Sequence, residues 1–413
     1  MLEGQYFKSG LEFYWEVLML INRRHLLLSG AALMAAGAMP GLRSAAFAAG
    51  GDPLKVGWFA ALSGPYATGA LAQDAGHRAA VAELNAKGGV LGRQLELVTR
   101  DTVADPGKAV NFAQELLFSE KVSVLFGPNT SGEAMAIRDF IAEANTINMP
   151  TALIDQVIDP KAYPSIFRVG GSAGQQIEAG ITFALDHFKK QKIALFVDNL
   201  SYGVLCRDLA LAKMKARNIE PAYVGTLDAN KVDLGDDVIK ARDAGADVLL
   251  VWSASSSFMA RVLTARGEQK WTVPAICAPI ALNAQITDLV KKDYLDGAVG
   301  VGFHHLAVDG NGKFAPGIEA MLAAQAAVVG PQLKNGITWI LLGYASTHLW
   351  AAAVEKAGSP DTDGVIKALE SMGTVETLFG KVGFGPDNRE GLSMDEYALF
   401  TISSFHNGGF SLA

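Results

Sequence analysis

The sequence predicts an α/β protein in which two doubly wound parallel sheets follow one another along the chain and are joined by crossover segments. From residue 54 onward, short runs rich in β-branched and aromatic residues alternate with longer helical stretches. This alternation is typical of βαβ units on a parallel sheet. It pauses at 167–171 (FRVGG) and then resumes, which indicates a second sheet. A chain of 413 residues can supply two lobes, each with its own core.

The elements follow in order from the hydrophobic pattern. The first set has expected strands at 55–59, 95–99, 122–126 and 151–154, and expected helices at 70–86, 108–118 and 132–144. The second set has expected helices at 175–188, 203–215, 234–244 and 257–265, and expected strands at 193–197, 222–227, 248–252 and 273–277. The remainder is expected to hold helices near 317–329, 339–357 and 362–372, and strands at 381–384 and 397–402.

The N-terminal segment 1–48 has the features of an export signal. Arg23 and Arg24 precede an apolar stretch, and the small-x-small triplet 46–48 (AFA) follows it. Paired arginines before a mildly apolar segment are typical of the twin-arginine pathway, with an ordinary secretory signal as the alternative. We therefore expect a periplasmic protein that is cleaved after Ala48.

Two further features of this segment bear on its interpretation. Pro40 and Arg43 interrupt the apolar stretch before it reaches the ~20 residues of a membrane span, which disfavours an anchor. Residues 1–18 contain Glu12 and Glu16 where a short basic start is expected, so we expect translation to begin at Met19.

The composition disfavours nucleic-acid, metal and phosphate chemistry. The formal net charge is -7, and no run of Lys and Arg could neutralise a phosphate backbone. There is no phosphate-binding loop, no His-Glu-x-x-His and no His/Cys cluster with zinc spacing, so no metal or cofactor is expected. Cys206 and Cys277 could form a disulfide or remain two buried thiols.

One motif could carry catalysis. Residues 170–174 (GGSAG) fit Gly-x-Ser-x-Gly, with acids and three histidines downstream in the order of an α/β-hydrolase triad. Ser172 would then be the nucleophile. The competing interpretation is a crossover followed by the start of a helix, and a short pattern in a Gly-rich chain favours that interpretation.

The segment 127–133 (GPNTSGE) ends an expected strand and opens an expected helix. Thr130 and Glu133 could form a capping box, and Ser131 with the first unpaired N–H groups could bind a carboxylate. In open α/β sheets, ligands lie at the carboxyl ends of strands. Residues at such ends outline a possible cleft between the lobes, namely Tyr66, Ser131, Ala152, Ile154, Asp155, Tyr202, Trp252 and Ser255.

An ordered series of motifs extends from residue 54 to the C-terminus: 62–65 (LSGP), 82–92 (AELNAKGGVLG), 104–106 (ADP), 167–168 (FR), 201–203 (SYG) and 380–384 (GKVGF). This series resembles the branched-chain amino-acid binding proteins of ABC transporters, which have the type I periplasmic-binding fold. The resemblance implies a non-enzymatic monomer with a ligand cleft between two lobes and an importer permease as its membrane partner. We expect lobe 1 at 54–170 plus 302–377, and lobe 2 at 171–301 plus 378–413.

The resemblance also implies roles for particular residues. In this family a serine at the position of Ser131 and backbone N–H groups around Ala152 hold the ligand carboxylate, and an aromatic residue at Tyr202 covers the ligand. The leucine-type proteins have an acid near position 280 and a threonine near position 154 for the ammonium group, whereas this chain has Ile280 and Ile154. Asp155 is the candidate replacement for the missing acid.

The sequence therefore predicts a periplasmic binder of a small ligand with a carboxylate or amide and a largely apolar or aromatic remainder. A conventional branched-chain amino-acid binder is the nearest alternative. Two alternatives from other classes are a hydrolase that uses Ser172 and a ligand sensor for a membrane receptor.

Replacing both Arg23 and Arg24 with lysine should abolish export, because the receptor of the twin-arginine pathway reads the arginine pair. The measurement is the periplasmic fraction of a reporter fused after Ala48. Undiminished export in a strain that lacks the twin-arginine translocase would assign the signal to the general secretory route.

Overall fold

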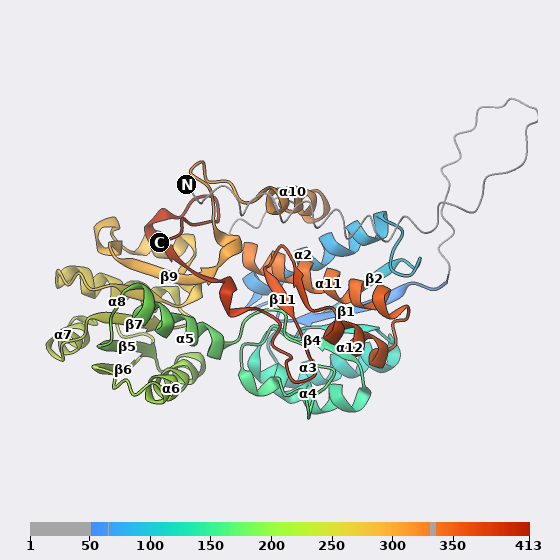
Figure 1. Cartoon of the computed structure of the whole chain (residues 1–413), viewed down its shortest axis with the longest axis horizontal. Coiled ribbons are helices and arrows are strands. Elements are labelled where there is room, and N and C mark those ends of the chain that lie inside the picture. The colour runs from blue at the N-terminus through green and yellow to red at the C-terminus, as the bar shows by residue number, and fades with distance from the viewer. Residues whose placement is uncertain (1–50, 65, 331–335) are drawn as a thin grey trace, which may run out of the picture. The chain divides into compact units, whose positions relative to one another are not determined.

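A four-stranded parallel sheet and a six-stranded, mostly parallel sheet, each with flanking helices, account for most of the described residues, which confirms the predicted α/β class (Figure 1). The computed structural model describes residues 51–64, 66–330 and 336–413. The predicted export signal, with Met19, Arg23 and Arg24, lies outside the described residues.

The first sheet has the strand order β2-β1-β3-β4, and all its strands are parallel. Its elements are β1 (Leu54–Ala60), α2 (Ala67–Ala86), β2 (Leu95–Asp101), α3 (Pro106–Gln114), β3 (Val124–Phe126), α4 (Ser131–Ala144) and β4 (Ile147–Met149). A π-helical turn at Glu115–Ser119 extends α3. The central strands β1 and β3 are almost entirely buried, as expected for a parallel sheet covered on both faces.

The second sheet has the order β12-β9-β8-β7-β5-β6, with only β12 antiparallel to its neighbour. It contains β5 (Ile193–Asp198), β6 (Tyr223–Leu227), β7 (Val248–Trp252), β8 (Ala275–Cys277), β9 (Ala298–Phe303) and β12 (Tyr397–Thr401). Its helices are α5 (Ala173–Thr182), α6 (Ser201–Ala216), α7 (Gly235–Asp243), α8 (Ser256–Glu268) and α9 (Ala284–Leu289).

After β9 the chain returns to the helices of the first sheet. The elements there are α10 (Pro316–Val329), α11 (Ile337–Ala357), α12 (Thr362–Ser371) and the hairpin strands β10 (Thr374–Glu376) and β11 (Lys381–Gly383). Helices α10 and α11 both pack against α2, beside which α11 lies in Figure 1. The backbones at Arg168 and Glu390 then pair in an isolated bridge, so two of the crossovers run side by side.

One strand prediction is wrong, and two strands, β9 and β10, were not predicted. The strand expected at 151–154 is wrong: β4 lies at Ile147–Met149, directly after the left-handed residue Asn145 that ends α4, and 151–154 is loop. Strand β9 was not predicted because Gly300 and Gly302 interrupt its β-branched pattern. A Cβ at either glycine would lie 2.5 Å from the Leu282 side chain, so these glycines make room for a packing contact.

Helices α2 and α11 approach each other so closely that their backbones touch. A Cβ at Gly76 would lie 2.0 Å from the carbonyl oxygen of Ile340, and one at Gly343 would lie 2.3 Å from that of Gln73. Helix α11 is long and apolar enough to cross a membrane, with a mean hydropathy of 1.3, but 78% of that stretch is buried in the protein. It therefore has the surroundings of a core helix.

Gly76→Ala should lower the free energy of unfolding by about 1–3 kcal/mol, because the added methyl group would overlap the α11 backbone. Urea unfolding of the mature protein measures the change. Gly310→Ala is the matched control, since a Cβ there has nothing within 4 Å. Equal stability of the two variants would show that the helices can separate without cost.

Candidate functional site

The first turn of α4 presents hydrogen-bond donors that have no acceptor in the part of the chain that the structure describes. The Thr130 hydroxyl accepts from the N–H of Glu133 (3.4 Å) and donates to the Glu133 carboxylate (2.5 Å). Thr130 therefore caps the helix, but the expected capping box is incomplete, because the Glu133 side chain accepts from the Thr130 hydroxyl and not from its N–H. The N–H groups of Ser131 and Gly132 and the Ser131 hydroxyl have no hydrogen-bond partner among the described residues. A helix start with unpaired donors favours an anion.

The loop after β4 lies beside this helix start. The N–H of Gly127 donates to Met149 (3.1 Å), and the N–H of Thr151 donates to Pro128 (3.1 Å), so the loops after β3 and β4 are bonded together. Ala152 is fully buried and packs with Ala134 of α4. Within the described ranges its N–H has no acceptor either. The structure therefore brings Ser131 and Ala152 together at one edge of the first sheet.

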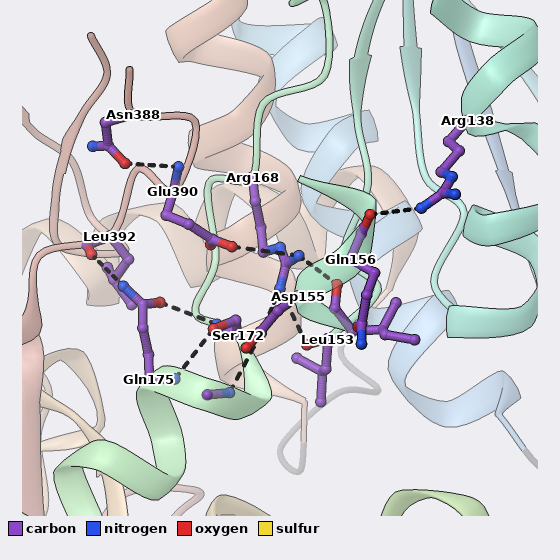
Figure 2. Close-up of polar contacts among 12 residues, drawn as sticks. Arg138, Leu153, Asp155, Gln156, Arg168, Ser172, Gln175, Asn388, Glu390 and Leu392 are labelled. Carbon is purple, nitrogen blue, oxygen red and sulfur yellow. Dashed lines mark hydrogen bonds and ion pairs between the residues drawn. The ribbon is translucent and has the colours of Figure 1, made fainter. Parts of the chain in front are cut away.

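Arg168 holds the next part of this loop. Its Nη1 donates to the carbonyl of Leu153 (3.1 Å; Figure 2). Its Nη2 donates to the carbonyl of Ile154 (2.7 Å). Its guanidinium is buried and lies 3.9 Å from the Asp155 carboxylate. Asp155 also accepts from the N–H of Gly174 at the start of α5 (3.4 Å). The carboxylate of Asp155 therefore already has a cation and a donor.

A second acid, Glu390, lies on the other side of Arg168 (Figure 2). One Glu390 oxygen is 3.5 Å from Nη2 of Arg168, and the other has no hydrogen-bond partner in the part of the chain that the structure describes. Burial raises the pKa of Glu390 to about 7, and the attraction of Arg168 offsets only part of that effect. Arg168 thus contacts two acids that belong to different segments.

The predicted residues of the second sheet follow the carboxyl ends of its strands. Tyr202 begins α6, and its hydroxyl donates to Oε1 of Gln176 (2.9 Å). Trp252 is fully buried at the end of β7. Ser255 caps α8 by accepting from the N–H of Phe258 (3.2 Å). Sequence reasoning treated Ser255 and Tyr202 as ligand contacts, and both hydroxyls have partners within the protein.

Asp198 connects the loops at the carboxyl ends of β5 and β7, and the sequence analysis did not identify it. Its carboxylate accepts from the Ser253 hydroxyl and from the N–H of Leu200 (2.9 Å), and the Ser253 hydroxyl accepts from the N–H of Ser255 (2.8 Å). Asp198 is buried at the end of β5. An acid directly after an apolar run (IALFVD) is the signal that could have identified it.

Two predicted residues are more exposed. Ile280 lies in a 3-10 turn after β8 with 41% exposure, and Tyr66 precedes α2 with 55% exposure. We call the edge of the first sheet that carries Ser131, Gly132 and Ala152 the anion edge. The loop that carries Tyr66 is held to it, because Asn129 accepts from the N–H of Ala61 (2.9 Å). No hydrogen bond among the described residues joins the Tyr66 side chain to another predicted site residue.

The Gly-x-Ser-x-Gly motif forms a helix cap. Ser172 accepts from the N–H of Gln175 (3.1 Å), and the Gln175 side chain accepts from the N–H of Ser172 (3.1 Å). Downstream, His305 is bonded to the carbonyl of Phe379 (2.8 Å) and to Thr338 (3.1 Å). Only isolated bridges at Ile166 and Arg168 precede the motif, whereas the nucleophile of an α/β-hydrolase follows a strand.

The cysteines and the acidic residues are also potential ligands. Cys206 and Cys277 are buried free thiols, and burial raises the pKa of each to about 12. The described residues contain no group of three or more His, Cys, Asp or Glu side chains placed to hold a metal ion.

Comparison with known proteins agrees with this architecture. A family model described as "Periplasmic binding protein" matches residues 53–406. The chain belongs to this family. The resemblance found in the sequence is thereby confirmed, as is its main functional interpretation, a periplasmic solute-binding protein. Family membership implies a periplasmic location, small-molecule ligands and work with transporter permeases.

Several relatives of this periplasmic binding protein cover most of its length. "Leu/Ile/Val-binding protein homolog 7" of Brucella abortus is 27% identical over 88% of this chain and 89% of its own. A "Leucine-, isoleucine-, valine-, threonine-, and alanine-binding protein" of Pseudomonas aeruginosa is 26% identical over 85% and 90%. A Rhodopseudomonas palustris solute-binding protein of an ABC transporter, in complex with p-hydroxybenzoic acid, has a TM-score of 0.71 at 20% identity, over 87% and 95%.

Glu390→Gln should stabilise the protein more at pH 8 than at pH 5. The folded pKa of about 7 lies above the ordinary value of 4.5, so the folded state binds the proton more tightly. The contribution of Glu390 to stability is therefore complete below about pH 4.5 and is lost as the pH rises through 7. The difference can reach about 3 kcal/mol, since one pKa unit corresponds to about 1.4 kcal/mol.

Urea unfolding of both proteins at the two pH values measures this difference. Glu376→Gln, an exposed acid on β10, controls for general charge effects. A larger gain at pH 5 than at pH 8 would show that the ion pair with Arg168 outweighs the burial of Glu390.

Proposed function

We propose that this protein is the solute-binding component of an ABC importer, and that it closes its two lobes on a small carboxylate or amide with a largely apolar or aromatic remainder. The observation that carries the proposal is the set of unpaired donors at the adjacent ends of β3 and β4. The N–H groups of Ser131, Gly132 and Ala152 and the Ser131 hydroxyl lack partners among the described residues. A carboxylate would accept from such donors in strong, charge-assisted hydrogen bonds.

The remainder of the site favours a ligand without an ammonium group. A buried ammonium needs a partner charge, because an uncompensated ion costs several kcal/mol. Ile280 and Ile154 offer none, and the Asp155 carboxylate already has Arg168 and the N–H of Gly174 as partners. A des-amino acid therefore fits these residues better than an amino acid.

The names of similar proteins include both candidate ligand classes, aromatic acids and branched-chain amino acids. The p-hydroxybenzoic acid complex is an example of an aromatic carboxylate without an amine. The substrate-binding protein LivJ of Streptococcus pneumoniae, solved with isoleucine, has a TM-score of 0.67 at 19% identity, over 87% of this chain and 99% of its own. A conventional branched-chain amino-acid binder is thus the second candidate, and the names of the Brucella and Pseudomonas relatives favour it.

The finer parts of the proposal rest on other observations. We propose lobes at 54–170 plus 302–377 and 171–301 plus 378–413. Strands β1 to β4 fall in the first of these, and β5 to β8, β12 and most of β9 fall in the second. The capping role of Ser172 argues against a nucleophile and favours a protein without catalysis. We further propose a cleaved twin-arginine signal, a monomeric state and no nucleic-acid partner, on the basis of the N-terminal motif and the acidic charge.

Titration calorimetry on the refolded, ligand-free protein should show tighter binding of des-amino acids than of the matched amino acids. The pairs are 4-methylpentanoate with leucine and 3-phenylpropanoate with phenylalanine, and 4-hydroxybenzoate extends the series. We expect at least a tenfold difference in Kd within each pair, because an unpartnered ammonium costs more than about 1.4 kcal/mol. Tight binding of leucine would instead establish the conventional amino-acid binder.

Two variants test the two halves of the site. Ser131→Ala should weaken binding of the carboxylates about tenfold, because it removes a donor to a charged acceptor. Ile280→Glu should weaken it through repulsion between like charges. Val224→Glu makes the same change near the amino end of the edge strand β6 and should leave Kd unchanged. Unchanged binding in Ser131→Ala would place the carboxylate elsewhere.

A further inference from the structure

A chain of buried polar side chains connects the loop after β4 to the helices α2 and α11. The Thr151 hydroxyl lies 3.2 Å from Oε1 of Gln73, and Nε2 of Gln73 lies 3.4 Å from Nε2 of His77. The Nδ1 of His77 lies 2.8 Å from the hydroxyl of Thr347, which donates to the carbonyl of Gly343 (3.0 Å). All four side chains are at most 5% exposed.

The donor and the acceptor in each bond of this hydrogen-bond chain follow from its last bond, between Thr347 and Gly343. The Thr347 hydroxyl has one proton, which it gives to Gly343, so it must accept from Nδ1–H of His77. The Nε2 of His77 then lacks a proton and accepts from the Gln73 amide. The other end of that amide, Oε1, accepts from Thr151. With the Gln73 amide oriented in this way, all of these hydrogen bonds form together only when His77 is a neutral imidazole protonated at Nδ1.

The surroundings of His77 keep it neutral. Its ring stacks on Phe126, with centroids 4.6 Å apart, and lies 4.8 Å from the ring of Trp58. Burial without a nearby acid lowers the pKa of His77 to about 3. His77 therefore stays neutral at pH values well above 3, and protonation does not disrupt the hydrogen-bond chain there. Gln73 and His77 lie on α2, and Thr347 lies on α11. The close backbone contact of these helices at Gly76 and Gly343 holds the three side chains next to one another.

We propose that His77 is a positioning residue for ligand binding: through Gln73 and Thr151 it holds the loop that presents the unpaired N–H of Ala152. This inference rests on the proposed function, because it assigns the ligand carboxylate to that loop. Thr151 immediately precedes Ala152, and its N–H also bonds to the loop before Ser131. The hydrogen-bond chain thus connects the core helices to both halves of the anion edge.

The first test is spectroscopic and needs no ligand. The mature protein with 15N-labelled histidine should show His77 as the Nδ1–H tautomer from pH 5 to pH 8, with the signal assigned by its loss in His77→Gln. A protonated Nε2 would overturn the proposal, because the chain would then run in the opposite direction and leave Thr151 without its acceptor.

The second test changes Thr347, at the far end of the hydrogen-bond chain, and measures the effect on the loop at Thr151. Thr347→Val removes a hydroxyl on α11 that has no contact with the loop. It should speed hydrogen exchange of the Thr151 amide about tenfold, relative to amides of β5 in the second sheet. It should also weaken binding of 4-methylpentanoate about threefold, and Thr151→Val about tenfold, as expected for loss of one buried hydrogen bond.

The matched control is Thr99→Val, which removes a hydroxyl on β2 that has no hydrogen-bond partner among the described residues. It should change neither measurement. If Thr347→Val lowers only the overall stability, with loop exchange and Kd unchanged, the chain is merely core packing and the proposal is wrong. If the wild type binds no carboxylate, the proposed function fails, while the tautomer and the exchange of the Thr151 amide still decide whether His77 positions the loop.

Discussion

The buried guanidinium of Arg168 is the interaction on which the arrangement of the site depends. It donates to the carbonyls of Leu153 and Ile154 and lies between the carboxylates of Asp155 and Glu390. Its backbone N–H donates to Arg389 (2.9 Å), so it also joins two crossovers. A buried cation requires such partners, and removal of any one would leave a charge or a carbonyl uncompensated. One side chain therefore couples the loop after β4 to the segments between the sheets.

The electrostatics of the site follow from this arrangement. Of the acids near the anion edge, Asp155 has Arg168 and the N–H of Gly174 as partners, and Oε2 of Glu133 accepts from Thr130, whereas Oε1 of Glu133 has no hydrogen-bond partner among the described residues. The donors that remain are backbone N–H groups and the hydroxyl of Ser131. Such a site can hold a negative group without a cationic side chain, and the apolar residues Ile154 and Ile280 then favour an apolar remainder.

Most of the fold could be predicted because hydrophobic periodicity directly encodes whether a segment is a buried strand or a one-sided helix. The predictions failed where contacts with other segments, and not the local hydrophobic pattern, decided the conformation. Strand β9 contains glycines that accommodate Leu282, and the apolar run at 151–154 is a loop whose polar groups bond to Arg168 and Gln73. A local pattern could not reveal either partner, because each lies far away in the sequence.

The sequence by itself determined the class of protein, the cap at Thr130 and the choice of Ser131 as the candidate anion-binding residue. These depend on neighbouring residues and on an ordered series of motifs. Tertiary structure decided which polar groups remain available to a ligand. Asp155 was a candidate for the ammonium until its distances to Arg168 and Gly174 were known. His77, Gln73 and Asp198 became relevant only through their partners. Availability depends on contacts between residues distant in sequence, and only the folded chain brings those residues together.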